Sequence, residues 1–294
     1  MVQQASLGHR VFTMFNYTFL TVLAFSCIFP IIHLLAVSFS SASAVASGEV
    51  ALLPVDFTVV SYLYVFGNSE FWQAFLVSVE RVLLGMVINM LLTVLLAYPL
   101  SKEVQQFRWR TIYAWFFVFT MLFSGGLIPW YMVINELGLL DSIWALVMPA
   151  AVPVFNVILM LNFFRGLPKE LDESAKIDGA GHWTIMWRIV LPLSLPSLAT
   201  VLLFTIVGHW NSWFDGLILM NDPGNYPLQS YLRTVVVESD VQFMSDMDIE
   251  MQLLLSDRTN RATQVFIAML PILAVYPLLQ RFFVKGIVLG SVKE

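Results

Sequence analysis

Residues 11–39 read VFTMFNYTFLTVLAFSCIFPIIHLLAVSF, a run with no acidic side chain and no lysine or arginine. A helix needs about 20 predominantly apolar residues to cross the hydrocarbon core of a bilayer. Unpaired backbone groups are costly in lipid, so such a run must be helical there. The run is also longer than the apolar part of a secretory signal, which is about 7–15 residues. We therefore predict an uncleaved spanning helix, despite the A-x-A pattern of Ala42 and Ala44 after it.

The whole chain is rich in apolar residues and poor in charged ones: of its 294 residues, 59% are hydrophobic and 12% charged. Soluble domains carry about 25% charged residues, so the composition excludes an ordinary soluble fold and a disordered chain. Six apolar runs predict six spanning helices, at about residues 11–39, 77–100, 111–133, 143–164, 190–220 and 265–284. The predicted fold class is an all-α integral membrane protein. One transmembrane domain would cover residues 1–294, with no room for a separate soluble domain.

The lysines and arginines predict the orientation of these spans. Most of the 15 lie in the leader, in the connections 101–110 and 165–189, and in the tail 285–294. The loop 40–73 has none, and the loop 221–262 combines its arginines with many acids, which count little in the positive-inside rule. Both termini are therefore predicted to be cytoplasmic, and these two loops to lie outside.

One arginine falls inside a predicted span. Arg81 is next to Glu80, near the outer end of residues 77–100. Neighbouring charges near a helix end can extend toward the interface. We expect a local structural pair there rather than a functional role inside the membrane.

The connection 165–189 is the most informative segment, and its residues 167–181 read LPKELDESAKIDGAG. Pro168 suits the first turn of a helix, and Gly179 can end that helix with a positive φ. A second helix is predicted from about Trp183, and Pro192 marks the start of the fifth span. The product is a helix–turn–helix pair at the predicted cytoplasmic face. The small residues of this pair allow a partner protein to approach closely, and its charged residues would fix how the pair is positioned against that partner.

A longer pattern in this segment resembles the EAA signature of ABC-importer permeases. The signature reads E-A-A, three residues, G, nine residues, I, one residue, L-P, and it is matched by Glu173, Ala175, Gly179, Ile189, Leu191 and Pro192. Ser174 departs from it, where the family usually has alanine. Residues 97–102 (AYPLSK), 210–215 (WNSWFD) and 281–286 (RFFVKG) resemble the carbohydrate-uptake branch. Residues 123–129 (FSGGLIP) are similar to permeases for complex oligosaccharides.

The resemblance implies a type I ABC importer permease with a cytoplasmic coupling helix, in the cytoplasmic membrane of a prokaryote. The residues that would contact the ATPase are Glu173, Ser174, Ala175, Asp178, Gly179 and Ala180. The implied partners are a second permease subunit in a heterodimer, two ATP-binding subunits, an extracytoplasmic solute-binding protein that meets the outer loops, and an oligosaccharide or other carbohydrate.

No motif indicates that the chain is itself an enzyme. It has no G-x-x-x-x-G-K-[ST] loop, no H-E-x-x-H pair and no G-x-S-x-G elbow. ATP and magnesium are therefore expected on the partner ATPase, with no cofactor or metal on this chain. The single cysteine, Cys27, cannot form an internal disulfide. The net charge of −5 and the absence of a basic stripe argue against nucleic acid binding.

Polar and aromatic residues of the fifth predicted span are candidates for contact with a sugar. They are His209, Trp210, Asn211, Trp213 and Asp215. Polar groups are costly in lipid and so tend to face the bundle interior or a cavity. An interfacial aromatic belt explains the two tryptophans equally well. Weaker candidates, for which a packing role is favoured, are Trp130, Tyr131, Asn135 and Asn156.

Three other functions compete with a carbohydrate importer. The first is an ABC permease for another solute, such as a polyamine or an amino acid. The second is a secondary transporter, which usually has inverted repeats, broken helices and buried ionisable residues. The sequence gives no convincing sign of these. The third is an intramembrane enzyme, for which a nucleophile–base pair is lacking.

Overall fold

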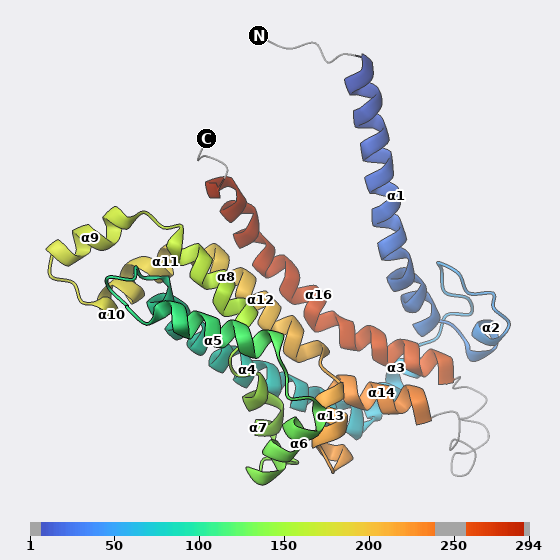
Figure 1. Cartoon of the computed structure of the whole chain (residues 1–294). Coiled ribbons are helices and arrows are strands. Elements are labelled where there is room, and N and C mark those ends of the chain that lie inside the picture. The colour runs from blue at the N-terminus through green and yellow to red at the C-terminus, as the bar shows by residue number, and fades with distance from the viewer. Residues whose placement is uncertain (1–6, 239–256, 291–294) are drawn as a thin grey trace. The chain divides into compact units, whose positions relative to one another are not determined.

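The computed structural model describes residues 7–238 and 257–290, and every regular element in those two ranges is helical (Figure 1). Three helices are each long and apolar enough to cross a membrane: α1 (Leu7–Ser38), α4 (Ser69–Ser101) and α16 (Asp257–Gly290). Three bent helix pairs bring the number of candidate spans to as many as 6. The predicted all-α membrane fold is confirmed. Residues 239–256 of the predicted outer loop and 291–294 of the tail lie outside the described residues.

The remaining helices are short. In the first half of the chain they are α2 (Ala42–Ala46), α3 (Val60–Gly67), α5 (Arg110–Leu122), α6 (Leu127–Glu136), α7 (Ile143–Val147) and the 3₁₀ turn η1 (Met148–Ala150). In the second half they are α8 (Val154–Arg165), α9 (Lys169–Ile177), α10 (His182–Ile185), the π-turn η2 (Met186–Val190), α11 (Leu191–Leu193), α12 (Leu195–Asn211), α13 (Phe214–Leu219), the 3₁₀ turn η3 (Pro223–Asn225) and α14 (Leu228–Glu238).

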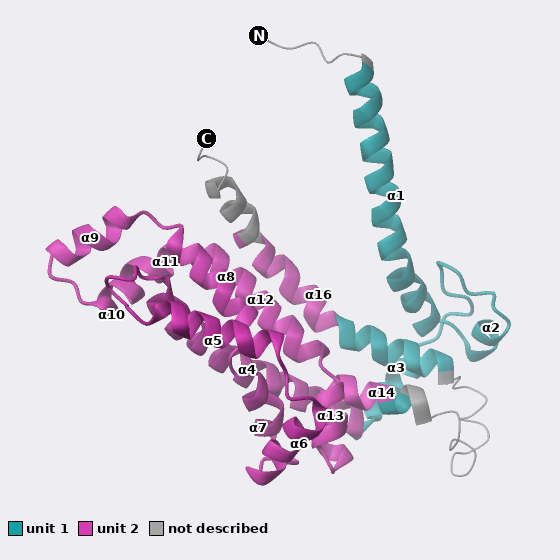
Figure 2. Cartoon of the chain, viewed as in Figure 1, with its two compact units in different colours: residues 1–69, 234–269 teal, residues 70–233, 270–294 magenta. Residues whose placement is uncertain are grey.

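Figure 2 shows that the chain divides into two compact units. Unit 1 comprises residues 1–69 and 234–269, and unit 2 comprises residues 70–233 and 270–294. In unit 1, Phe39 stacks on Tyr62 with ring centroids 4.5 Å apart. The hydroxyl of Thr263 donates to the carbonyl of Ser38 at 3.5 Å, so the end of α1 meets the first turns of α16.

Unit 2 holds the largest described core, which joins α4, α8, α9 and α12. Its buried residues include Ala97, Met160, Ala175, Ile185 and Val201. Within this unit, α9 and α10 lie at one end of α4, α5, α8 and α12, while α6, α7 and α13 lie toward the other end (Figure 1). The predicted helix–turn–helix pair is thus held against the ends of the spanning helices.

Three of the six predicted spans are not straight helices. Residues 111–133 are divided into α5 and α6, which meet at 110°. Gly126 takes a φ of +87° at this break, a conformation that residues with a Cβ rarely adopt. Residues 143–164 bend by 44° just before α8, where Pro153 supplies no backbone donor.

The fifth predicted span begins and ends differently from expectation. The helical segment 182–193 meets α12 at 82°. At this bend the carbonyl of Val190 accepts from the hydroxyl of Ser194 at 2.6 Å and from the backbone amide of Ser194 at 3.1 Å. The continuous helix then stops at Asn211 rather than at Met220. The expectation of no broken helices is therefore corrected by all three bent spans.

Candidate functional site

The short helix α9 forms where the sequence predicts it. Acidic residues in its first turn and Lys176 in its last turn favour the helix dipole. Gly179 has a φ of +79°, as expected for a residue just past the helix end. The amide of Gly179 donates to the carbonyl of Lys176 at 3.0 Å, and that of Ala180 to the carbonyl of Ala175 at 2.9 Å. These two bonds are the Schellman arrangement, so the turn after α9 is well defined.

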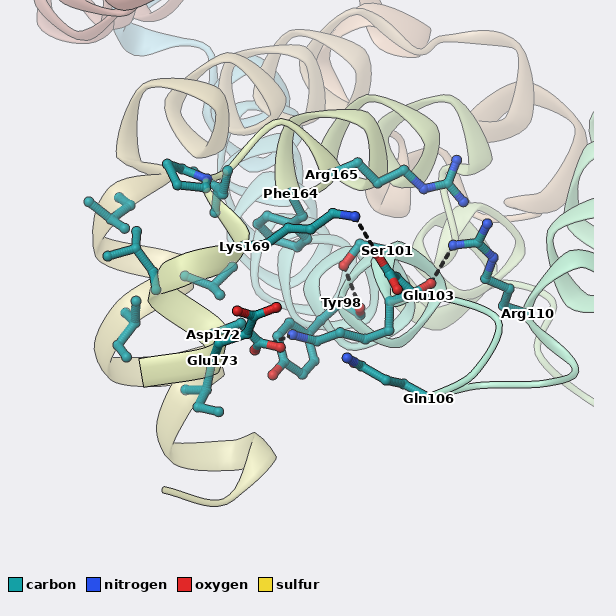
Figure 3. A pocket seen from close by; sticks show the side chains of 18 of the residues that line it. Tyr98, Ser101, Glu103, Gln106, Arg110, Phe164, Arg165, Lys169, Asp172 and Glu173 are labelled. Carbon is teal, nitrogen blue, oxygen red and sulfur yellow. Dashed lines mark hydrogen bonds and ion pairs between the residues drawn. The ribbon is translucent and has the colours of Figure 1, made fainter. Parts of the chain in front are cut away.

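Ion pairs connect α9 to the end of α4. Nζ of Lys102 lies 2.7 Å from Oδ1 of Asp172, and Nζ of Lys176 lies 2.7 Å from Oδ2 of the same carboxylate. Lys169 pairs with Glu103 (Figure 3). Since Lys102 and Glu103 directly follow α4, the two pairs between α9 and this segment join α9 to the long helix.

The pKa values of these groups follow from their partners. Burial acts to raise the pKa of Asp172, but hydrogen bonds from Lys102 and Lys176 outweigh it and leave the pKa below its ordinary 3.8. The hydrogen bond and charge of Lys169 lower the pKa of Glu103, and Glu103 raises the pKa of Lys169. The lowered pKa values keep the Asp172 and Glu103 carboxylates charged at neutral pH, so both can take part in their ion pairs.

The six residues predicted to contact an ATPase are divided by their exposure. Glu173, Ser174, Asp178 and Gly179 are exposed, whereas Ala180 is half-buried. Ala175 is only 6% exposed and packs into the core of its own chain, so its small size serves close packing within unit 2.

Two exposed apolar residues on this segment were missed by the sequence analysis. Ile177 is 87% exposed and Trp183 is 67% exposed. The sequence did carry a signal for Ile177, because it is a large apolar residue at the end of a short, charged helix. We call the exposed set Glu173, Ser174, Ile177 and Asp178 the α9 surface.

A second group, of four polar residues and one glycine, lies along the buried face of α4. These are Ser78, Arg81, Gly85, Asn89 and Thr93, which we call the α4 seam. Their spacing of three or four residues places them on one face of the helix. Burial of such groups in an otherwise apolar spanning helix indicates a face that packs against protein rather than lipid.

Arg81 pairs with Asp215 and not with Glu80. It is 2% exposed, and its guanidinium donates to both carboxylate oxygens of Asp215, the Nη1–Oδ1 distance being 3.2 Å. Nη1 is also 3.4 Å from the carbonyl oxygen of Ser212. Glu80 is exposed. The expected local pair is thus corrected: α4 begins eight residues before the predicted span, so Arg81 lies inside the helix and faces the α12–α13 junction.

His209 is the second predicted residue that reaches the α4 seam. Its Nε2 lies 2.7 Å from Oδ1 of Asn89. Nδ2 of Asn89 donates in turn to the carbonyl of Ala150 at 2.6 Å. A Cβ built on Gly85 would lie 2.4 Å from Nε2 of His209. Asn89 was missed by the sequence analysis, although its four-residue spacing from Gly85 was a usable signal.

The other predicted pathway residues are not brought together. Trp210 is buried and meets Phe75 edge to face, with ring centroids 5.6 Å apart. Asn211 is exposed. Trp213 is 42% exposed, with the guanidinium of Arg233 located 5.4 Å from its ring centroid.

The weaker candidates are mostly in packing positions. Trp130 and Tyr131 pack against a small apolar cluster formed by α6, α7 and α13. The Nδ2 of Asn156 donates to the hydroxyl of Thr205 at 3.3 Å inside the bundle. Asn135 is exposed.

Three long apolar helices, three bent helix pairs and a short helix held at one end of the bundle define the class of an all-helical, multi-pass membrane protein. The sequence comparisons agree with that class. The chain belongs to the family described as binding-protein-dependent transport system inner membrane component, whose sequence profile matches residues 7–289. The resemblance to ABC-importer permeases is therefore confirmed.

Individual relatives cover almost the whole chain. The chain is 40% identical to the polygalacturonan/rhamnogalacturonan transport system permease protein YtcP of Bacillus subtilis (strain 168), over 98% of this chain and 100% of that protein. It is 41% identical to Protein LplC of the same organism, over 97% of this chain and 95% of that protein. Among solved structures, it is similar to a chain of a bacterial ABC transporter involved in import of the acidic polysaccharide alginate. The TM-score is 0.86 and the identity 31%, over 96% of this chain and 100% of that chain.

Proposed function

We propose that this chain is one of two permease subunits of an ABC importer that takes up an oligosaccharide bearing acidic sugars. Two similar proteins support the substrate class, since one is named for polygalacturonan and rhamnogalacturonan and the other for the acidic polysaccharide alginate. The second permease subunit completes the pathway, and an extracytoplasmic binding protein delivers the sugar. The termini and α9 lie on the cytoplasmic side.

The observation that carries the mechanism is the attachment of α9 to α4. The α9 surface is exposed, yet α9 is joined to the end of α4 by the pairs Lys102–Asp172 and Lys169–Glu103. Ala175 packs beneath it. In the proposed mechanism the α9 surface occupies a cleft of an ATP-binding subunit, which carries ATP and magnesium. A pull on α9 then acts on α4 without first unfolding a flexible loop.

The α4 helix is placed to convey that movement into the membrane. It is a continuous helix of 33 residues, about 50 Å long at 1.5 Å per residue. Its seam contacts the α12–α13 junction through Arg81 and α12 through Asn89. We infer that His209 and Asp215 transmit movement between helices. The exposed Asn211 and Trp213 are the remaining candidates for contact with the sugar.

The test is coupled uptake by the reconstituted importer in proteoliposomes. Ile177→Asp places a charge at the centre of the α9 surface and should abolish uptake while the permease still folds. Leu137→Asp is the matched control, because Leu137 is also exposed, at 66%, and lies at the predicted outer end of unit 2. This control should retain uptake.

Two results would contradict the proposal. One is normal uptake by the Ile177→Asp variant. The other is labelling of a cysteine at Ile177 from the outer side of the membrane. Transport of an amino acid or a polyamine, without transport of galacturonate oligomers, would support the non-sugar alternative.

A further inference from the structure

A cavity of about 550 Å³ lies between the α4–α5 connection and the segment from α8 to α11, all within unit 2 (Figure 3). Its walls differ in chemistry. One wall, the basic wall, is formed by Lys102, Arg110, Arg165 and Lys169. Three carboxylates, those of Glu103, Asp172 and Glu173, also line the cavity, so its basic side chains exceed its acidic ones by one. The other wall is apolar and includes Phe164, Leu167, Ile185, Ile189, Val190 and Leu193. The cavity is therefore suited to a molecule with an anionic end and an apolar body.

The two lysines of the basic wall are neutralised by carboxylates, but the two arginines are not. Lys102 pairs with Asp172, and Lys169 with Glu103. Arg165 donates to the carbonyl of Leu100 at 3.1 Å, and Arg110 donates to the carbonyl of Lys102. Neither arginine forms an ion pair with a carboxylate among the described residues, although Arg110 is close enough for its charge to act on Glu103.

The charges of this arginine pair favour a further anion. The guanidinium groups are close enough for the charge of Arg110 to act on Arg165, and Figure 3 shows both side chains on the side of the cavity away from Asp172 and Glu173. Nε of Arg110 is buried and has no hydrogen-bond partner among the described residues. An anion between the arginines would relieve their repulsion.

The cavity lies at a level where spanning helices end. The α4 helix ends at Ser101, α5 begins at Arg110 and α8 ends at Arg165. These ends are the natural boundary between hydrocarbon and water. Basic pockets between spanning helices on the cytoplasmic side are known binding places for anionic lipid head groups.

We propose that this cavity binds an anionic phospholipid, with the phosphate held by Arg110 and Arg165 and an acyl chain along Ile189 and Leu193. A free phosphate shares the head-group chemistry, but the apolar wall favours a lipid, because inorganic phosphate gains nothing from apolar surface. The site adjoins the pairs that join α9 to α4, so a bound lipid would stiffen that junction. The cytoplasmic location rests on the proposed function, whereas lipid binding itself does not.

Native mass spectrometry of the purified, full-length protein with its co-purifying subunits tests this assignment. The protein in detergent is titrated with phosphatidylglycerol, with phosphatidylcholine and, in a separate arm, with inorganic phosphate. Phosphatidylglycerol should bind more tightly than phosphatidylcholine. Each arginine removed should weaken that binding about fivefold, so Arg110→Gln with Arg165→Gln should weaken it about 25-fold.

Matched variants distinguish a specific lipid site from binding by general surface charge and from loss of binding through misfolding. Arg108→Gln removes an exposed arginine of the same connection that does not line the cavity, and it should leave binding unchanged. Leu193→Glu keeps both arginines and their carbonyl bonds but places a negative charge on the half-exposed edge of the apolar wall, and it should also reduce binding.

Three outcomes would overturn the proposal. They are equal affinity for the two lipids, loss of affinity in Arg108→Gln as large as in the double variant, and saturation by inorganic phosphate with no preference for lipid. None of these outcomes depends on sugar uptake, so the failure of this inference and the failure of the proposed function are distinguishable.

Discussion

Replacement of Gly85 by alanine should destabilise unit 2 through a clash with one identified side chain. The new Cβ would lie 2.4 Å from Nε2 of His209 and 2.6 Å from two further ring atoms. His209 is 7% exposed and its Nε2 is bonded to Asn89 at 2.7 Å. The ring therefore has little space into which to move, and any movement lengthens that hydrogen bond.

The expected cost has two parts. Overpacking of a close-packed interior costs about 1–3 kcal/mol. Loss of a hydrogen bond between helices in a membrane adds about 0.6 kcal/mol on average. The helix preference for alanine over glycine offsets about 1 kcal/mol of this cost. The free energy of unfolding should thus fall by roughly 1–3 kcal/mol, which is about a 5- to 150-fold change in the unfolding equilibrium constant. Unfolding in mixed micelles, with an increasing fraction of a denaturing detergent, measures this change.

Gly208 provides the matched control in the helix that carries His209. A Cβ built on Gly208 meets nothing within 4 Å. Gly208→Ala should therefore be neutral or slightly stabilising, because alanine is favoured over glycine in a helix by about 1 kcal/mol. A large loss in both variants would mean that any substitution of glycine is harmful here, independent of His209.

A double variant tests the assigned cause directly. In Gly85→Ala with His209→Ala, the added methyl group occupies space vacated by the ring. The double variant should be at least as stable as His209→Ala alone. If Gly85→Ala costs as much in the His209→Ala background as in the wild type, the reasoning is refuted.

Three further predictions concern the other polar contacts. Arg81→Gln should destabilise by about 3 kcal/mol, the lower limit for a broken buried ion pair, because the half-buried Asp215 carboxylate keeps only Ser212 and Gly216 as donors. Replacing both Arg81 and Asp215 by leucine should cost much less, and equilibrium unfolding measures both effects. The pKa of Asp172 is lowered on folding, so the contribution of Asp172 to the stability of the folded state is complete above pH 3.8 and is lost as the pH falls through the lower, folded value. Spin labels on α9 and on the α4–α5 connection, in a Cys27→Ser background, report this loss, because the distribution of distances between them should broaden only in that acidic range. Gly179→Ala should cost about 1–2 kcal/mol because of its φ of +79°, while Gly181→Ala, with ordinary φ and no neighbour within 4 Å, should cost almost nothing, as thermal unfolding of the two variants would show.

The sequence predicts local features of this chain more completely than contacts between distant segments. The helix Lys169–Ile177 and the positive φ of Gly179 follow from local capping chemistry, and both are confirmed. The number of apolar runs likewise follows from composition, because each run is a property of consecutive residues.

The bends and the polar pairs could not be obtained in the same way. A sliding average of hydropathy gives one unbroken apolar run over residues 111–133, although α5 and α6 meet at 110° within it. Glycine is common in membrane helices, so Gly126 alone does not indicate a break. The pair Arg81–Asp215 joins residues 134 positions apart, and no local pattern in a single sequence identifies such a partner.

That separation has a consequence for how the protein is made. During synthesis the helix bearing Arg81 enters the bilayer long before Asp215 has left the ribosome. An arginine at the centre of an inserting helix costs about 2.5–3.5 kcal/mol on insertion scales. A nascent chain therefore carries an uncompensated charge through the insertion of two later spans. Any product truncated before the α12–α13 junction keeps that defect and should be recognised by membrane proteases, which would remove incomplete subunits before they assemble.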